Sequence, residues 1–136
     1  MRSRIVTLFM VAMMLPMLAT FASAQDDSYI VVNGSGAFAL DENNDGDLDL
    51  IRVIASIVTT APSASVGVEV IADNGDMAIS FWNNTTIQYD DSFIANTTVK
   101  AWSDGEYQIT LRVWDLESGL MIHDEDLDTH ELMASL

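Results

Sequence analysis

The chain of 136 residues contains no cysteine. A small exported domain often relies on disulfides for its stability, and this chain can form none. A cysteine nucleophile and a thiolate metal site are excluded for the same reason. A bound metal ion is another way to stabilise such a domain, because an ion that binds only the folded state favours folding.

Basic residues are also scarce. After residue 24 only Arg52, Lys100 and Arg112 are basic, against 21 acidic residues, which gives this part of the chain a net charge of −18. Nucleic acid and anionic lipid are therefore not expected as partners, because both require a basic surface. A surface this acidic suits a medium rich in salt or divalent ions, which screen the repulsion between carboxylates.

Sustained helical periodicity and catalytic motifs are missing as well. After residue 24 no segment repeats its apolar residues with a helical period, and no nucleophile elbow, zinc-protease motif or phosphate-binding loop occurs. Pairs of carboxylates are numerous, but 21 acidic residues make some pairs unavoidable, so they do not support a glycosidase. We therefore expect no enzymatic activity.

The first 24 residues have the pattern of a secretory signal peptide. A basic start, residues 1–4, precedes an apolar stretch over residues 5–21, and Ala22-Ser23-Ala24 supplies small residues for cleavage. The alternative is an uncleaved membrane anchor, since the apolar stretch approaches the roughly 20 residues that a span needs. We expect cleavage before Gln25, no membrane insertion afterwards, and a secreted or cell-surface protein with one domain, residues 25–136.

The domain is predicted to be an all-β antiparallel sandwich of about seven to nine strands. Apolar residues on both sides of segment 48–59 are typical of a central strand that is covered on both faces. Asn74-Gly75 between two alternating segments predicts a two-residue hairpin turn, and residues 33–36 are expected to turn the chain. The expected strands are 29–32, 48–59, 66–70, 77–81, 85–89, 93–102, 105–115, 120–123 and 129–136.

Segment 105–115 alternates most regularly, and its inward residues are expected to be Tyr107, Ile109, Leu111 and Val113. Its sequence, GEYQITLRVWD followed by Ser118-Gly119, resembles the G-x-Y-x-[VI]-x-L-x-V-x-D-x-x-G strand of PKD and related immunoglobulin-like domains. The W-D-F-G-D-G segment of PKD domains is missing. The resemblance implies an immunoglobulin-like sandwich of the kind found in calcium-binding modules of microbial surface proteins.

Residues 41–49 form the clearest candidate site. Side chains with oxygen atoms recur at every second position, and Gly46 provides the conformational freedom that a tight loop needs. Hard cations such as Ca²⁺ bind about six to eight oxygens, most of which a short loop can supply. The predicted ligands are Asp41, Asn43, Asp45, Asp47 and Asp49.

The loop matches only the first half of an EF-hand pattern. The position of the bidentate glutamate is occupied by Arg52, and a β-branched apolar segment follows where an EF-hand has a helix. The loop instead resembles the D-x-[DN]-x-D-G-x-x-D loops of extracellular β-proteins, which implies ligation by the Asp47 carbonyl and by the other four side chains. The alternatives are an acidic turn without an ion, or another metal.

The tryptophans and histidines are weaker candidates. Exposed faces of Trp82, Trp102 and Trp114 would stack on sugar rings and make a carbohydrate-binding module; otherwise they cover strand ends or an interface. His123 and His130 are seven residues apart, so on a regular strand they face opposite sides and only a bent loop would join them at zinc or copper. The surrounding segment is otherwise a solvated acidic turn or a weaker calcium site formed by Asp124, Asp126 and Asp128.

Sequons mark Asn33, Asn83, Asn84 and Asn96 as candidate glycosylation sites in an exported protein. Taken together, the sequence predicts a secreted or cell-surface β-sandwich that is stabilised by calcium and has a binding or structural role. Its expected partners are calcium and either a cell-surface polysaccharide or another surface protein.

Overall fold

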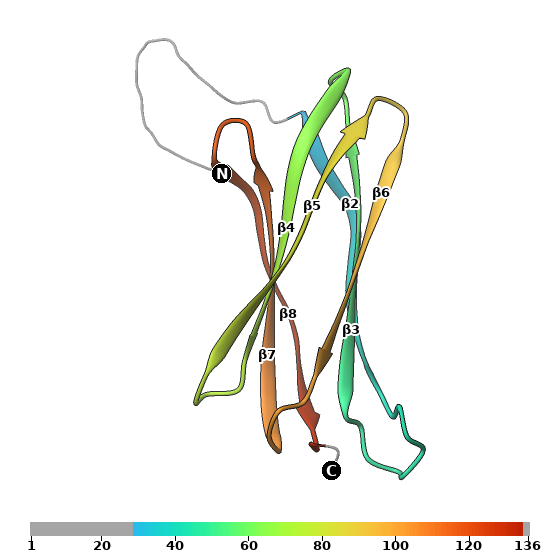
Figure 1. Cartoon of the computed structure of the whole chain (residues 1–136), viewed down its shortest axis with the longest axis vertical. Coiled ribbons are helices and arrows are strands. Elements are labelled where there is room, and N and C mark those ends of the chain that lie inside the picture. Colours follow the sequence, from blue (N-terminus) through green and yellow to red (C-terminus); the bar gives the residue numbers. More distant parts are fainter. Residues whose placement is uncertain (1–28, 135–136) are drawn as a thin grey trace.

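The computed structural model describes residues 29–134, and the predicted signal peptide at residues 1–24 lies outside them. These residues form seven strands and no helix, so none of them belongs to a helix that could cross a membrane. A three-stranded sheet has the order β2-β3-β6, and a four-stranded sheet has the order β5-β4-β7-β8 (Figure 1). The strands are β2 (Ile30–Leu40), β3 (Leu50–Thr59), β4 (Ser63–Asp73), β5 (Ala78–Gln88), β6 (Ser92–Lys100), β7 (Gly105–Asp115) and β8 (Leu120–Leu132).

Every strand pairing is antiparallel, which confirms the predicted all-β sandwich and its number of strands. The core lies between the two sheets and is formed by alternate residues, mainly of the central strands β3, β4 and β7. The expected inward set of β7 is confirmed, because all four side chains are fully buried: Tyr107, Ile109, Leu111 and Val113.

Strand β3 is central in its sheet, as predicted, but only one of its faces is covered. Ile51, Val53 and Ile57 are buried in the core, whereas on the other side Ile54 and Val58 are half-buried and Leu50, beside the acidic loop, is buried. Within residues 29–134 no element lies over this outer face. The prediction of two covered faces is therefore wrong for the single chain, although the apolar residues that suggested it are present.

The expected turn at residues 33–36 is wrong. These residues lie inside β2, where the register with β3 shifts between Val32 and Gly34. Glycine within a strand often marks such a bulge, and an edge strand such as β2 tolerates one because its second side has no partner strand.

Two other strands run further than predicted. Segments 77–81 and 85–89 belong to one strand, β5, and the acidic segment 124–128 lies within β8 instead of forming a turn. Pairing of β5 with β4 and of β8 with β7 outweighs the low strand propensity of asparagine and aspartate. The hairpin at Asn74-Gly75 is confirmed, but its register pairs Asp73 with Ala78, so the loop has four residues and not two.

Tyr107 fixes the end of the sandwich at which the β2–β3, β4–β5 and β6–β7 connections lie (Figure 1). Its hydroxyl donates to the Ser103 carbonyl at 2.6 Å and accepts from the amides of Trp102 and Ser103, each at 3.1 Å. The Trp102 ring packs edge-on against it, with the ring centroids 4.8 Å apart. A buried tyrosine that bonds to the backbone just upstream in this way is a recurring device of β-sandwiches, known as a tyrosine corner.

We predict that Tyr107→Phe lowers the free energy of unfolding by about 2 kcal/mol, because a buried polar group left without its partner costs about 1–3 kcal/mol. The aromatic ring and its packing are retained, so the change isolates the hydroxyl. Urea unfolding measures the effect, and Tyr89→Phe is the matched control because Tyr89 is exposed. Equal stabilities of the two variants would contradict the role given to the hydroxyl.

Candidate functional site

The acidic loop, residues 41–49, connects β2 to β3 and is anchored to several elements at its base. The Asp49 amide donates to the Leu40 carbonyl at 2.9 Å, and the Asp49 carbonyl accepts from the Ala101 amide at 3.0 Å. The Leu48 carbonyl accepts from the Met133 amide at 2.8 Å. The base of the loop is therefore joined to β2, to the segment after β6 and to the segment after β8.

Four of the five predicted ligands accept hydrogen bonds from the loop's own backbone. Asp41 accepts from the amides of Asp45 at 3.3 Å and Gly46 at 2.8 Å. Asn43 accepts from the Asp45 amide at 3.3 Å, and Asp45 accepts from the Asp47 amide at 2.9 Å. Asp49 is buried and accepts from the Glu42 amide at 2.9 Å. These bonds hold the four side chains against the loop's own backbone.

The backbone of the loop has the tight curvature that was expected at Gly46. Gly46 has a φ of 95° and Asn44 a φ of 61°, both in the left-handed region that glycine and asparagine tolerate best. Glu42, which is not a predicted ligand, forms an exposed ion pair with Lys100 at 3.0 Å. The basic side chain beside the loop is thus directed to Glu42 and not to the predicted ligands.

The donor set suits calcium, because every predicted ligand atom is oxygen and Ca²⁺ prefers oxygen. Within residues 29–134, however, no three or more His, Cys, Asp or Glu side chains form a group that could hold a metal ion. The hydrogen bonds of the loop therefore order its donors without bringing them together into such a group. Binding of an ion would require the loop to contract around it.

Two of the three tryptophans lie together on the outer face of the four-stranded sheet. The rings of Trp82 on β5 and Trp114 on β7 have centroids 6.2 Å apart and are tilted by 39°. Gly67 on β4 lies between them, and a Cβ atom there would come within 3.3 Å of the Trp82 ring and 2.9 Å of Leu116. Glycine therefore provides the space in which these side chains meet.

Trp102 does not belong to this surface pair. It is half-buried in the β6–β7 connection, where it packs against Tyr107 and the core. Of the two alternatives for the tryptophans, Trp102 therefore takes the second and covers a strand end. A position near a strand end does not distinguish a ring that points outward from one that closes the end of the core.

Glu69 is a buried carboxylate beneath the tryptophan pair that the sequence pattern did not single out. It is 8% exposed although it lies on the outer face of β4. It accepts from Trp114 Nε1 at 3.1 Å and from Ser80 Oγ at 3.0 Å. The alternation over residues 66–70 indicates that Glu69 faces outward. Its hydrogen bond to Trp114 was not predicted, because that bond joins residues that are far apart in the sequence.

A polar cluster joins the edges of the two sheets where β2 faces β8. Glu125 Oε1 accepts from Ser35 Oγ at 2.8 Å and lies 2.9 Å from His123 Nε2. These two hydrogen bonds, from His123 first and Ser35 second, lower the pKa of Glu125 below its ordinary value. The cluster was not predicted, because Ser35 was assigned to a turn and Glu125 to a solvated segment.

His123 and His130 face the same side of β8, contrary to the prediction from their spacing. His123 pairs with Val113 and His130 with Tyr107, both inward residues, because one register shift, opposite Gln108 and Thr110, lies between the two histidines. The His130 Nε2 atom is buried and has no hydrogen-bond partner among the described residues. The two histidines and the neighbouring acidic residues form no metal-holding group within residues 29–134.

The candidate glycosylation sites differ in accessibility. Asn33, Asn84 and Asn96 are exposed, whereas Asn83 is half-buried and donates to Thr97 Oγ1 at 3.2 Å. Asn84 lies beside Gly67 and the tryptophan pair, and Asn96 lies on the outer face of the three-stranded sheet.

Comparisons with known proteins do not assign a family. No protein-family model and no curated protein matches the chain. A solved structure described as the X-ray structure of Northeast Structural Genomics Consortium target SoR45 is similar over 78% of this chain and 87% of its own, with 13% identity and a TM-score of 0.39. At that score the similarity carries no argument about function.

The Glu125 cluster predicts a pH dependence. Because its pKa is lowered in the folded protein, Glu125 adds stability above the ordinary carboxyl pKa, and this stability is lost as the pH falls through the lowered pKa. When the pH is lowered from about 6 to about 3, the melting temperature of the Glu125→Gln variant should therefore fall by less than that of the parent protein. Asp91→Asn, in the exposed β5–β6 turn, is the control. Identical pH profiles of the Glu125 variant and the parent would contradict the cluster's contribution.

Proposed function

We propose that the protein is a secreted or cell-surface β-sandwich that is stabilised by calcium at residues 41–49 and acts as a binding or structural module without catalytic activity. The observation that carries this proposal is the set of hydrogen bonds by which the oxygens of Asp41, Asn43, Asp45 and Asp49 accept from the loop's own amides. The β7 sequence and its tyrosine corner support a relation to PKD and other immunoglobulin-like modules. Export rests on the signal-peptide pattern of residues 1–24.

Calcium at this loop would act mainly on stability. The loop base is bonded to β2 and to the segments that follow β6 and β8, so an ion held there would fix parts of both sheets at one end of the sandwich. Asp49 is buried and would be joined to the exposed residues Asn43 and Asp45 by a shared ion. In a chain with no disulfide, such a link restricts the motion of a nine-residue connection.

We expect calcium to raise the melting temperature by several degrees and EDTA to reverse the increase. An ion at about 100 times its Kd stabilises the folded state by about 2.7 kcal/mol. Calorimetric titration and thermal melts in calcium, magnesium and EDTA measure the effect.

Asp45→Ala should abolish this calcium response, and Asp91→Ala should retain it. Asp91 lies in an exposed turn between β5 and β6, so its replacement removes the same charge without touching the loop. Asp45→Asn keeps an oxygen that accepts from the Asp47 amide, so it separates loss of the turn from loss of the ligand charge. If the calcium response is equal in all variants, the ion does not bind at this loop.

A second candidate function, carbohydrate binding, is favoured by the tryptophan pair. Trp82 is exposed, and its ring stands beside Trp114, whose orientation is fixed by Glu69. An exposed ring held in this way offers an apolar face to a sugar, and the neighbouring exposed Asn84 offers polar atoms. The ligand would be a neutral polysaccharide, because the many carboxylates on this sheet repel acidic ones.

Binding to insoluble and soluble neutral polysaccharides tests this function through pull-down and tryptophan fluorescence. Trp82→Ala should reduce binding at least about tenfold, since stacking on one aromatic ring contributes about 0.5–1.5 kcal/mol beyond the area it buries. Tyr89→Ala is the control, because Tyr89 is an exposed aromatic residue in the β5–β6 turn. Binding that survives in the Trp82 variant would place any sugar elsewhere.

A further inference from the structure

The outer face of the three-stranded sheet contains no acidic residue, although the chain has 21 of them. Strands β2, β3 and β6 contain no aspartate or glutamate, and their charged residues are Arg52 and, at the end of β6, Lys100, which is paired with Glu42. We call this surface the acid-free face; its residues are Val31, Gly34, Gly36, Phe38, Arg52, Ile54, Ser56, Val58, Ser92, Ile94, Asn96 and Thr98.

The opposite surface of the sandwich differs sharply in charge. The outer face of the four-stranded sheet has acidic residues from β4, β7 and β8: Glu69, Asp73, Glu106, Asp124, Asp126 and Glu131. The remaining acidic residues of the described chain lie in the connections at the two ends, in β8, or, for Asp115, at the inward-facing end of β7. The carboxylates are thus segregated from one broad sheet face.

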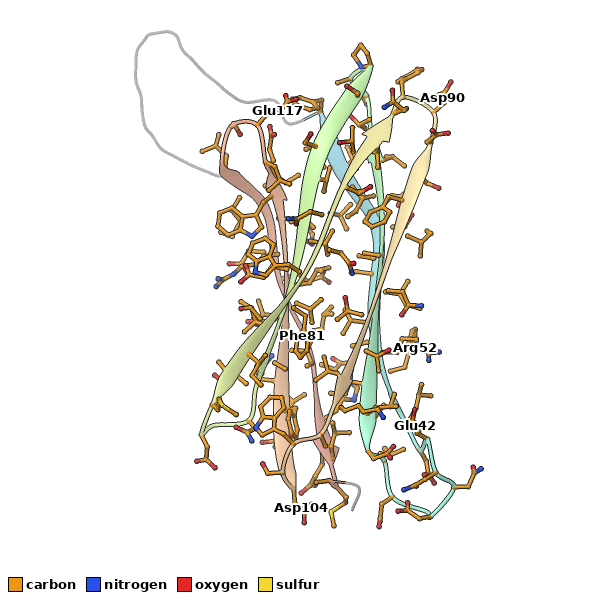
Figure 2. All side chains as sticks on the ribbon, viewed as in Figure 1. Glu42, Arg52, Phe81, Asp90, Asp104 and Glu117 are labelled. Atoms are coloured by element: carbon orange, nitrogen blue, oxygen red, sulfur yellow. The ribbon has the colours of Figure 1, made fainter. Side chains whose placement is uncertain are left out.

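The acid-free face is also apolar and uncovered. Phe38, Ile94 and Val31 are 51%, 54% and 42% exposed, and Ile54 and Val58 between them are half-buried. Figure 2 shows Arg52 on the side of β3 that points away from the four-stranded sheet. The apolar residues on both sides of β3 are those expected of a strand that is covered twice, and one chain covers it only once.

We propose that the acid-free face is the interface of a homodimer, in which two copies pack their three-stranded sheets against each other. Each copy carries a net charge of about −18 after signal removal, so contact through any acidic surface would place like charges together. The acid-free face is the surface on which two identical chains meet without that repulsion. Its apolar side chains then lose their contact with water.

The shape of the face fits a copy of itself. A hollow of about 220 Å³ lies over Gly34, Gly36, Ile54 and Ser56, with Phe38 at its border. Ile94 protrudes on the other side of Ser56 and at the same height, because Gly34 and Ile94 are both register partners of Ser56. A two-fold axis along β3, in the plane between the sheets, brings Ile94 of each copy over the hollow of the other.

The size of the face predicts a weak dimer. Three strands of about ten residues span about 33 Å by 14 Å, so two copies would bury roughly 950 Å² in total. This is below the roughly 1,200–2,000 Å² of stable interfaces. The axis along β3 would also bring the two Arg52 side chains near each other and the two acidic loops to the same end of the dimer, so like charges there weaken it further. We therefore expect self-association in the micromolar range, strengthened by salt that screens the net charge.

Sedimentation velocity tests the proposal at protein concentrations of about 1–500 µM, a range suited to weak association. The protein is expressed from the full-length sequence in a host that adds no N-glycans. The measurement is made in calcium and in EDTA, and at low and high salt, so the result does not depend on the loop. A wild type that remains monomeric under all these conditions overturns the proposal, including the case in which another kind of partner covers the face.

Two variants change the acid-free face in different ways, and one control variant lies outside it. Ile94→Glu introduces an acid, and Gly34→Leu fills the hollow at a position where an added Cβ meets no atom within 4 Å. Each should weaken association at least about tenfold. Leu120→Glu, at the 63%-exposed start of β8, should associate like the wild type. Thermal melts establish that each variant folds. Association that is retained in either face variant, or lost equally in the Leu120 control, overturns the proposal.

Discussion

Burial of alternate apolar side chains between the two sheets is the interaction on which the rest of the molecule depends. Each fully buried valine, leucine or isoleucine contributes roughly 1.5–3 kcal/mol, and the core contains many of them. An exposed ion pair such as Lys100–Glu42 contributes at most about 1 kcal/mol. The chain has no disulfide to add. Polar groups are therefore placed first of all so that the space between the two sheets stays apolar.

The high negative charge is compatible with this core because of where the carboxylates lie. They are placed in the connections, on β8 and on the outer face of the four-stranded sheet, where water and ions surround most of them. The buried exceptions are bonded: Asp115 accepts from the Tyr29 hydroxyl at 2.9 Å, and Glu69 accepts from Trp114 and Ser80. Burial, followed by the bond to Asp115, raises the pKa of Tyr29, so its hydroxyl remains a donor.

The sequence was sufficient to predict the sandwich because its central strands alternate without interruption. Strand β7 was placed to the residue, and its buried set was identified. The edge strands were predicted poorly, because β2 contains glycines and β8 contains five acidic residues, and both compositions are also typical of turns. Their strand conformation comes from pairing with β3 and β7, which a local pattern does not contain.

Among the candidate sites, too, the sequence predicted those formed by neighbouring residues and missed those formed by residues from different strands. The acidic loop was identified because its residues are consecutive, and the hydrogen bonds that order its side chains join residues two to seven positions apart. Glu69, which holds Trp114, and Glu125, which holds Ser35, were missed because Trp114 and Ser35 come from other strands. The parity argument for His123 and His130 failed because it assumed a strand without bulges.

The free edge of β8 has a consequence for how molecules of this kind aggregate. Asp124, Asp126 and Asp128 line this edge, whereas the other edge strands, β2, β5 and β6, contain no acidic residue. A strand from another chain that approached β8 would meet a row of carboxylates, which opposes edge-to-edge pairing. Uncontrolled growth of the four-stranded sheet is thereby blocked at one end, and ribbon-like polymers could extend only from the uncharged edges.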